Sequence, residues 1–415
     1  MPLAADTAPV DVTLPGLGRC LRVYNAPEVL EALVRAMPGW PLRREPAAGV
    51  SPGLYVYRDG EGLWQSDPGT AEEFMLPSSA SAACSLAADL LSLRLEHDNE
   101  LVGLHCGSVE IDGRLALFPQ SSRAGKSTLA TAFAAAGYRL FGDDVLGLTP
   151  AGKGMAMGVA PRLRLPLPTS FSAEFADYTR RRAGPEDDRY RFVVPPDGGL
   201  ARSEETRPLG ALVLLERHDA PVAPEALPLA PGEGLLQLLC QNFARETPPE
   251  ALMARFMPLM QHLPCLLLRY SEPLAGARHL AQVLERGESK LIGKKGFADT
   301  GPAPAVGAAA HSAETPAVAR DAPWKPGTHV NVYPLGDELF LIHTPSGEIH
   351  RLNLTGRLVW QLLQHEALTV NELGELLADY FAAPAGAVTD DVATLMGELH
   401  RAGLVIAESS RAQAK

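Results

Sequence analysis

One segment, residues 115–135, constrains the fold more than any other. It reads LALFPQSSRAGKSTLATAFAA: an apolar run from Leu115 to Phe118, a loop that ends in Gly-Lys-Ser, and an alanine-rich helical run that begins near Lys126. A loop of this kind turns backbone N–H groups towards phosphate, and the start of the following helix adds partial positive charge. Strand-like and helix-like runs alternate on both sides of it, from residue 97 to 288. The segment therefore predicts an α/β nucleotide-binding domain.

The loop departs from the usual Walker pattern, because Gln120 replaces its first glycine and Arg123 stands where a small residue is often found. Neither change forbids phosphate binding, since a non-glycine residue with allowed dihedrals fits and an arginine adds a cation beside an anion site. We expect Lys126 on the outer phosphates of ATP and the Ser127 hydroxyl on Mg²⁺. The alternative is a chance Gly-Lys-Ser at a helix start. The residues expected to hold the nucleotide are Ser122, Arg123, Ala124, Gly125, Lys126, Ser127 and Thr128.

Two neighbouring features fit this interpretation. Upstream, Asp112-Gly113 indicates a two-residue hairpin turn that places His105 on the strand next to the loop. Downstream, YRLFGDDV predicts a short strand that ends in Asp143 and Asp144. One carboxylate beside a phosphate loop can coordinate the metal while the other accepts a proton. The alternatives are a core histidine and a pair of turn-capping aspartates.

The histidine, the Gly-Lys-Ser loop and the Asp-Asp pair together resemble the HPr kinase/phosphorylases, which share a nucleotide-binding core with phosphoenolpyruvate carboxykinases. The resemblance covers residues 97–288, and in the loop only Ser122, Gly125, Lys126 and Ser127 match the family's pattern. It implies a P-loop kinase core of the HPr kinase/PEP carboxykinase type. It also implies an acid–base step served by His105 and Asp143, and a metal held by Asp144 with Ser127.

The later run APRLRLPLP is similar to a proline and arginine run of that family, which implies that Arg162 and Arg164 face the phosphates. The alternative is a strand with two exposed arginines. The strand signature associated with reverse phosphorolysis is missing, so the resemblance favours a kinase without phosphorylase activity.

The C-terminal residues 328–410 carry three strand patterns and then three helix patterns, a winged-helix-like α+β unit of order βββααα. Thr369 and Glu372 have capping-box spacing, Asp390 and Asp391 are expected in the first turn of the last helix, and Gly403 is expected to end it.

The motif LN-x-TG-x-x-x-W-x-L at residues 352–362, with DDV at 390–392, resembles the PqqD-like peptide chaperones, which are leader-recognition elements of ribosomally made, modified peptides. The resemblance implies that a leader peptide adds as a strand beside the third β-strand. The residues expected at that edge are Gly347, Glu348, Ile349, His350, Arg351 and Leu352.

The remaining segments bear less chemistry. Residues 1–96 are interpreted as a packing subdomain, with a helix expected at residues 80–98. The Pro-, Ala- and Gly-rich residues 289–327 are interpreted as a flexible linker between two tethered parts. The net charge of −12, and five Lys and Arg against eleven Asp and Glu from residue 326 onwards, argue against a nucleic-acid partner. Scattered cysteines and the lack of a long apolar run favour a cytoplasmic protein without a membrane segment.

Together these patterns predict an ATP- and Mg²⁺-dependent kinase that phosphorylates a Ser or Thr hydroxyl of a precursor peptide, with Asp143 as general base, His105 in support and Lys126 on the phosphoryl group. One alternative is a catalytically inactive, nucleotide-gated peptide chaperone. Another is a kinase of an HPr-like carrier protein or of a small molecule. Other peptide-modifying enzymes are further candidate partners, and an oligomer is left open.

Overall fold

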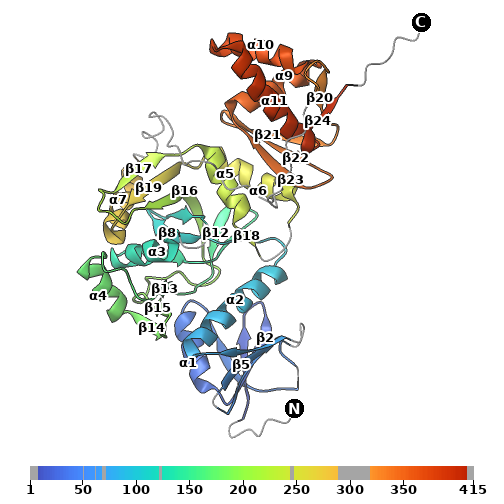
Figure 1. Ribbon diagram of the computed structural model, residues 1–415. Helices are drawn as coiled ribbons and strands as arrows, with labels where there is room; N and C mark the ends of the chain where they lie inside the picture. The colour runs from blue at the N-terminus through green and yellow to red at the C-terminus, as the bar shows by residue number, and fades with distance from the viewer. Residues whose placement is uncertain are drawn as a thin grey trace. The chain divides into compact units, whose positions relative to one another are not determined.

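The computed structural model describes residues 8–49, 51–60, 62–67, 72–120, 124–243, 247–287 and 318–408. They form two compact units (Figure 1). The first contains residues 8–230, 237–243 and 263–287, and the second contains 231–236, 247–262 and 318–408, each with the gaps given above. The predicted boundary differs, because two short pieces of the expected kinase domain group with the C-terminal residues. In the described part of the chain, no helix is both long and apolar enough to cross a membrane.

The N-terminal part of the first unit is a six-stranded sheet of order β3-β1-β2-β4-β5-β6 with two helices packed against it. Its strands are β1 (Val10–Leu14), β2 (Gly18–Tyr24), β3 (Arg43–Pro46), β4 (Leu54–Asp59), β5 (Gly62–Asp67) and β6 (Glu72–Leu76), and its helices are α1 (Pro27–Ala36) and α2 (Ser79–His97). The predicted helix in this region is therefore present as α2. Its core also includes Met155, Met157 and Phe192, which come from the following part of the chain. The N-terminal layer is thus joined to the rest of the first unit by a shared core.

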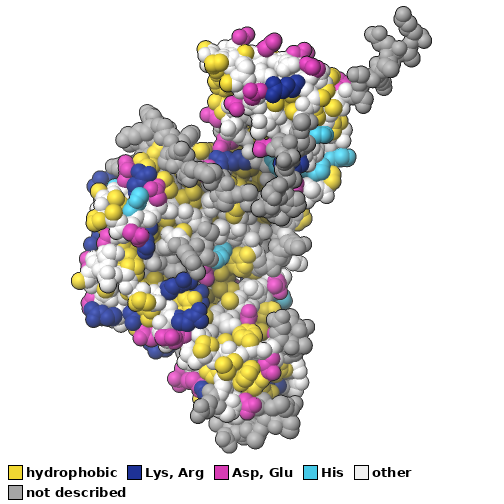
Figure 2. Space-filling view, viewed as in Figure 1, with side chains coloured by type: hydrophobic (Ala, Val, Ile, Leu, Met, Phe, Trp, Pro, Cys, Tyr) yellow, Lys and Arg dark blue, Asp and Glu magenta, His cyan; other side chains and the backbone are white. Residues whose placement is uncertain are grey.

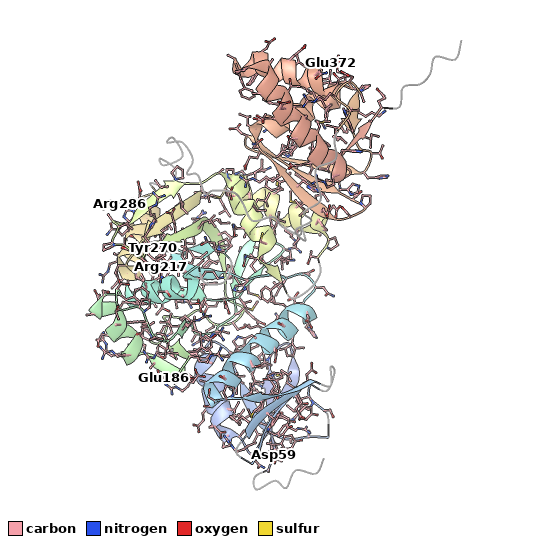
Figure 3. All side chains as sticks on the ribbon, in the orientation of Figure 1. Asp59, Glu186, Arg217, Tyr270, Arg286 and Glu372 are labelled. Carbon is pink, nitrogen blue, oxygen red and sulfur yellow. The ribbon has the colours of Figure 1, made fainter. Side chains whose placement is uncertain are left out.

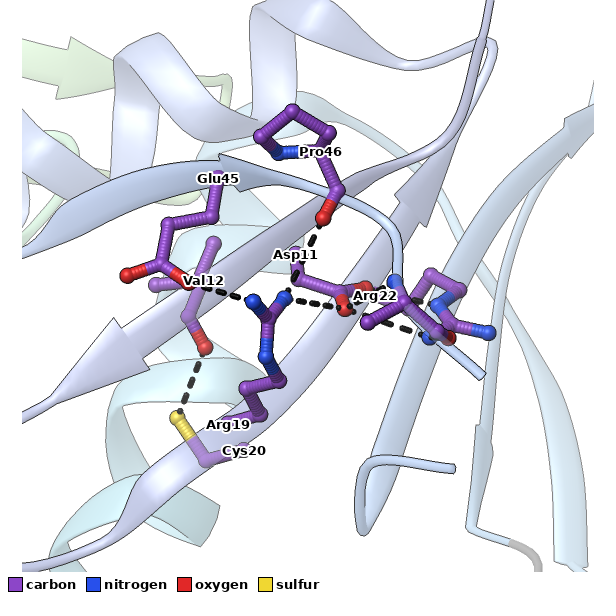
Figure 4. A network of polar contacts seen from close by, with 8 residues as sticks. Asp11, Val12, Arg19, Cys20, Arg22, Glu45 and Pro46 are labelled. Carbon is purple, nitrogen blue, oxygen red and sulfur yellow. Dashed lines mark hydrogen bonds and ion pairs between the residues drawn. The ribbon is translucent and has the colours of Figure 1, made fainter. Parts of the chain in front are cut away.

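A buried charge ties three strands of this layer together (Figure 4). Asp11 on β1 is completely buried and pairs across the sheet with Arg22 and Glu45. Its carboxylate accepts hydrogen bonds from Arg22 at 2.6 Å and from Arg19 at 2.8 Å. Burial alone raises the pKa of Asp11, but the hydrogen bonds from Arg22, Ala48 and Arg19 outweigh it and lower the pKa. This paired, charged aspartate has a structural role.

The centre of the first unit is a ten-stranded mixed sheet. The longest strand, β16 (Thr206–Arg217), pairs in parallel with β9 (Arg114–Phe118) and β19 (Cys265–Tyr270) and antiparallel with β12 (Lys153–Ala156). The other strands are β7 (Val102–Leu104), β8 (Gly107–Ile111), β10 (Arg139–Gly142), β11 (Leu146–Leu148), β17 (Glu225–Pro228) and β18 (Asn242–Phe243). A separate three-stranded sheet has the order β13-β15-β14, with β13 (Arg162–Arg164), β14 (Ala183–Glu186) and β15 (Tyr190–Val193). This is a mixed α/β architecture, as predicted.

Three helices share a core with the ten-stranded sheet: α3 (Lys126–Ala135), α4 (Ala173–Arg181) and α7 (Pro273–Glu285). Helix α3 packs on α7 and on strands β8 and β10, and its buried residues share a core with Val213 and Leu268 of the central sheet. Strand β9 leads into the loop before α3, so the predicted strand, loop and helix follow in the expected order. Asp112 and Gly113 have φ of 53° and 73°, the left-handed values that a tight two-residue hairpin needs.

The second unit contains the C-terminal domain, whose three-stranded sheet has the order β21-β22-β23. Its strands are β20 (Trp324–Pro326), β21 (Val330–Leu335), β22 (Glu338–His343), β23 (Glu348–Leu352) and β24 (Val405–Ala407), and its helices are α9 (Leu354–His365), α10 (Val370–Phe381) and α11 (Ala385–Arg401). The three strands and three helices were predicted, and so was the capping box at Thr369 and Glu372. Trp360, Leu373 and Leu399 are buried in its core.

Two expectations for this domain are wrong. Helix α11 begins at Ala385 after Pro384, so Asp390 and Asp391 lie in its second turn and not in its first. Strand β20 pairs with β24 and lies inside the segment interpreted as a linker. Proline at the N-cap position explains the earlier helix start, because its fixed φ suits the residue that precedes the first turn. Gly403 does follow the end of α11, with φ of 70°.

Both faces of the C-terminal sheet are covered. Leu339 and Leu341 of β22 pack into the core with α9 to α11, while Phe340 and Ile342 alternate to the opposite face and are also fully buried. Two helices that precede this domain in the chain, α5 (Pro231–Cys240) and α6 (Pro249–Met260), contribute residues to the second unit. Helix α6 packs against β21, and Arg351 of β23 forms an ion pair with Glu233 of α5. The C-terminal domain and these helical residues therefore form one packed body.

Candidate functional site

The loop before α3 ends in a glycine with a left-handed backbone conformation. Gly125 is the N-cap residue of α3, with the left-handed dihedrals φ 98° and ψ 13°. A side chain there is disfavoured twice, because those dihedrals suit glycine and a Cβ would lie 3.0 Å from the hydroxyl of Tyr270. Ser122 and Arg123, two of the predicted nucleotide ligands, lie outside the described residues. Ala124, Gly125, Lys126, Ser127 and Thr128 are described at the positively polarised end of α3.

Gln120, which stands in place of the first glycine of the loop, forms side-chain hydrogen bonds to strand β16. Its side-chain amide donates to the carbonyl of Leu215 at 3.1 Å and accepts from the N–H of Leu215 at 2.7 Å. The side chain thus bonds to β16 in the way a neighbouring strand would, beyond the point where β9 ends. Its backbone carbonyl accepts a hydrogen bond from Lys126 at 2.5 Å. The glutamine therefore fixes the start of the loop.

Lys126 is almost completely buried, with 6% of its surface exposed. Burial lowers the pKa of its ammonium group, and the nearby Asp144 and Asp143 oppose that shift. The side chain reaches back across the loop to Gln120. A lysine in this position is well placed to contact an oxygen of a phosphate that enters the loop.

Asp143 directly follows β10 and is the most unusual carboxyl of the site. It is 6% exposed, its Oδ2 accepts the backbone N–H of Arg162 at 3.0 Å, and its Oδ1 is buried with no hydrogen-bond partner among the described residues. Burial, helped by the negative charge of Asp144, raises the pKa of Asp143 to about 7, while the N–H of Arg162 and the Ser127 hydroxyl act in the opposite direction. A carboxyl that titrates near neutral pH is suited to accept and release a proton.

Asp144 has the opposite character, since half of its side chain is exposed. Its Oδ1 lies 3.0 Å from Nε2 of His105, and its Oδ2 lies 4.0 Å from a guanidinium nitrogen of Arg162. The hydrogen bond with His105 is the main cause that lowers the pKa of Asp144. The two carboxyls thus have pKa values that are pushed apart, which is the usual sign of two different chemical tasks.

His105 lies close to the predicted strand but not on it. It lies between β7 and β8, just before the strand, where its backbone N–H bonds to the carbonyl of Gln241 at 2.8 Å. Its ring pairs with Asp144 and not with Asp143, and meets the ring of Phe243 edge-on at 6.4 Å. Cys106 separates His105 from Gly107, where β8 begins, so the histidine lies in the short connection between β7 and β8. Spacing along the sequence gave no signal for Gln241 or Phe243.

The two predicted arginines, Arg162 and Arg164, have different surroundings. Arg162 lines the cavity described below, and its guanidinium also lies 4.9 Å from the centre of the Tyr190 ring. Arg164 is exposed and lies 6.0 Å from the same ring centre. The structure brings Arg162 to the carboxylates and leaves Arg164 on the surface.

A cavity of about 290 Å³ opens beside these groups. Its charged and polar wall consists of His105, Asp143, Asp144 and Arg162. Its other lining residues are mostly apolar and include Met157, Val159, Phe192, Phe243 and residues of helix α2. The volume is at the lower end of the range typical for ligand sites, about 300 Å³ and upwards.

The site has the ligands that Mg²⁺ prefers, but few of them. The Ser127 hydroxyl, the ionised Asp144 and the Asp143 carboxyl supply hard oxygen donors. Among the described residues, no group of three or more His, Cys, Asp or Glu side chains is arranged to hold a metal alone.

Tyr270 and Arg217, which carried no signal in the sequence, end the two parallel strands next to the loop (Figure 3). They are register partners of β19 and β16. The hydroxyl of Tyr270 is buried without a hydrogen-bond partner in the described chain, and burial raises its pKa. The hydroxyl of Tyr270 leaves little room for a side chain at Gly125, so Tyr270 contributes to the shape of the loop.

The predicted peptide-binding strand is β23, which begins after Gly347 with φ of 71°. It is an edge strand of the sheet, with β22 as its neighbour. Glu348 is exposed, whereas Leu352 is in the core and Arg351 donates to Glu338 at 2.9 Å. Ile349 and His350 are partly buried. The side chains of Leu352 and Arg351 are thus occupied within the domain, and the free feature of β23 is its backbone edge.

On the face shown in Figure 2, the charged side chains over the C-terminal helices are mostly acidic. This agrees with the excess of Asp and Glu over Lys and Arg from residue 326 onwards.

Comparisons with known proteins support the C-terminal part most directly. The model of the family "Coenzyme PQQ synthesis protein D (PqqD)" matches residues 338–405, which run from β22 to β24. The chain therefore carries a PqqD domain at its C-terminus, as predicted. A search of the curated proteins found no match.

Two solved structures are similar to parts of the chain. One is TbiB1 in complex with the TbiA(beta) leader peptide, with 20% identity over 21% of this chain and 99% of that chain, and a TM-score of 0.20. The other is the Hpr(Ser) kinase/phosphatase from Coxiella burnetii, with 13% identity over 46% of this chain and 97% of that chain, and a TM-score of 0.24. TM-scores this low do not establish a shared fold, so the geometry of the site and the PqqD match carry the functional argument.

Proposed function

We propose that this chain is an ATP- and Mg²⁺-dependent kinase that phosphorylates a Ser or Thr hydroxyl of a ribosomally made precursor peptide, which its PqqD domain recruits. The observation that carries the proposal is Asp143: a buried carboxyl with an unpartnered oxygen and a pKa near 7, next to the Gly-Lys-Ser end of a phosphate loop. A hydroxyl nucleophile needs such a base when the phosphoryl donor is held at the adjacent helix start.

In this proposal each residue has one task. Lys126 and the first N–H groups of α3 hold the phosphates of ATP, and Ser127 and Asp144 hold Mg²⁺, which neutralises charge on the phosphate oxygens when it is bound. His105 keeps the Asp144 carboxylate in place through their 3.0 Å contact. Arg162, which lines the same cavity, adds a cation beside the transferred group.

The chemical step is a direct phosphoryl transfer. The peptide hydroxyl oxygen forms a bond to the γ-phosphorus of ATP, and the bond from that phosphorus to the β,γ-bridging oxygen breaks, so that ADP leaves. The hydroxyl proton passes to Asp143. The leader segment of the peptide binds as an added strand along β23, outside the residues that perform this step.

The test is intact-mass spectrometry of the candidate precursor peptide encoded beside this gene, after incubation with the full chain, ATP and Mg²⁺. We expect the mass gain of one phosphoryl group, and at least a 10²-fold slower gain with Lys126→Ala, in the range seen when one electrostatic contact to a transition state is lost. Lys153→Ala is the matched control, because Lys153 is an exposed lysine on β12.

Two results would contradict the proposal. Equal phosphorylation by Lys126→Ala would remove the loop from the reaction. No mass gain with the unmodified chain, while calorimetry shows that ATP binds, would favour the alternative of a nucleotide-gated peptide chaperone.

A further inference from the structure

Helix α2 of the N-terminal layer forms a wall of the cavity that contains Asp143 and His105. Its cavity-lining residues are Cys84, Ala87, Ala88, Leu91 and Ser92. They recur every three or four positions, so they form one face of the helix. This face is made of small or apolar side chains, and the N-terminal segment interpreted as a packing subdomain thus contributes directly to the candidate site.

The cavity lies on the acceptor side of the carboxylates. Asp143 and Asp144 line it, whereas the described loop residues Ala124 to Ser127 do not. A nucleotide held by the loop and the start of α3 would leave this space free. A group that enters the cavity would meet the carboxyls of Asp143 and Asp144 without contacting Ala124 to Ser127 first.

The chemistry of the walls restricts what can enter. The charged lining residues are two carboxylates, one histidine and one arginine. Apart from Cys84 and Ser92, the rest of the lining is apolar, and Met157 and Phe192 are almost fully buried parts of the N-terminal core. An acidic group would lose hydration there and would be repelled by Asp144, while an apolar group would gain from burial.

We propose that this cavity is the acceptor pocket of the kinase, and that the cavity-lining face of α2 selects a hydroxyl-bearing residue with uncharged, apolar neighbours. The inference rests on the kinase function proposed above and adds to it the class of acceptor. Ala88 is its most informative residue, because it lines the cavity and is solvent-exposed, so that it lies at the mouth. Bulk added at Ala88 narrows the entrance without disturbing the core.

The experiment uses the full chain with Ala88→Phe, and Ala173→Phe as the matched control, since Ala173 is an exposed helical alanine of α4 that does not line the cavity. The probes are two short synthetic peptides with one serine each, flanked by leucine and alanine in one and by aspartate in the other. Initial rates of phosphorylation give kcat/KM, and calorimetry gives the affinity for ATP. Thermal melting verifies that both variants fold.

We expect the unmodified chain to prefer the apolar peptide by at least about tenfold in kcat/KM, a ratio that one well-fitted pocket contact can produce. Ala88→Phe should lower kcat/KM for that peptide by at least about tenfold with ATP affinity and melting temperature unchanged, and Ala173→Phe should change neither. Equal rates for the two peptides, or an unaffected Ala88→Phe variant, would overturn this inference alone. No phosphorylation of either peptide or of the precursor by the unmodified chain would overturn the kinase function, and this inference with it.

Discussion

Asp143 holds its proton more tightly than an ordinary aspartate, because burial and the neighbouring charge of Asp144 raise its pKa to about 7. A general base acts only when it is deprotonated. We therefore expect kcat/KM for the peptide to be constant above neutral pH and to fall about tenfold per pH unit below about pH 7. Initial rates between pH 5 and 9, roughly the range over which such a group titrates, measure this profile. A profile that stays flat down to pH 5 would exclude Asp143 as the base.

The raised pKa of Asp143 also predicts that ionisation of this buried carboxyl destabilises the folded state. The folded-state pKa of Asp143, about 7, lies above the ordinary value of 3.8, so the folded state is favoured below about pH 4 and loses stability as the pH rises through 7. Asp143→Asn removes the buried charge and should raise the free energy of unfolding at pH 8 by on the order of a few kcal/mol, but not at pH 4. Urea denaturation at both pH values measures it. Asp197→Asn at an exposed aspartate is the control, and a variant that is equally stabilised at pH 4 would show that charge burial is not the cause.

Asp144 is expected to stay ionised, because its hydrogen bond with His105 lowers its pKa. If it holds Mg²⁺ with Ser127, Asp144→Asn should raise the Mg²⁺ concentration for half-maximal rate by at least about tenfold, as expected when one charged ligand is lost. Asp143→Asn should instead reduce the rate at every Mg²⁺ concentration. A titration of rate against Mg²⁺ distinguishes the roles of the two carboxyls. An unchanged half-maximal Mg²⁺ concentration in Asp144→Asn would contradict Asp144 as the metal ligand and favour Asp143 in that role.

The sequence predicted which site residues come together, but not how they pair. His105, Lys126, Asp143 and Asp144 do meet near the start of α3. Which carboxyl the histidine contacts depends on how the connection between β7 and β8 is held. Its backbone bond to Gln241 joins residues more than a hundred positions apart, so no local spacing encodes that contact. Gln120 is a similar case, because its two bonds to Leu215 depend on the parallel pairing of β9 and β16.

At the scale of elements, β23 is the strand whose free edge is expected to receive the leader peptide. In an antiparallel pair, successive residues direct both backbone groups alternately to the neighbouring strand and away from it. Proline at Ile349 or at His350 therefore removes a ladder donor in one case and an outward donor in the other. We expect the proline variant that loses only the outward N–H donor to keep its melting temperature. It should bind a fluorescent leader peptide at least about tenfold more weakly. Unchanged leader affinity in both folded variants would exclude strand addition at β23.

Elements with a strong local period were predictable, and elements defined by distant partners were not. The helix patterns of α2, α3 and α10 and the hairpin at Asp112 appear as expected, because capping, periodicity and turn chemistry are local. The three-residue strands β20 and β24 exist only because they pair with each other across the domain. The role of α2 as a cavity wall had no signal either, since its small residues are ordinary for a packed helix.

At the scale of the whole molecule, the proposal separates recruitment of the peptide from its phosphorylation. A simple deletion of the C-terminal domain is a poor test, because residues of α5 and α6 belong to the same packed unit and Leu252, Met253 and Phe256 of α6 are buried. Removing the domain would expose apolar surface and destabilise the chain for reasons unrelated to peptide binding. The division of labour is better tested by changing the peptide.

We expect the full-length precursor and its leaderless core peptide to have similar kcat but very different KM. A leader bound to β23 supplies the core at an effective concentration in the millimolar range, so losing it should raise KM by about 10²-fold or more, while the transition-state contacts at Asp143 and Lys126 remain. Steady-state kinetics with the intact chain and both peptides measure the two constants. A leaderless peptide with unchanged KM would show that the PqqD domain does not recruit this substrate, and one with a lowered kcat would show that leader binding also acts on the catalytic groups.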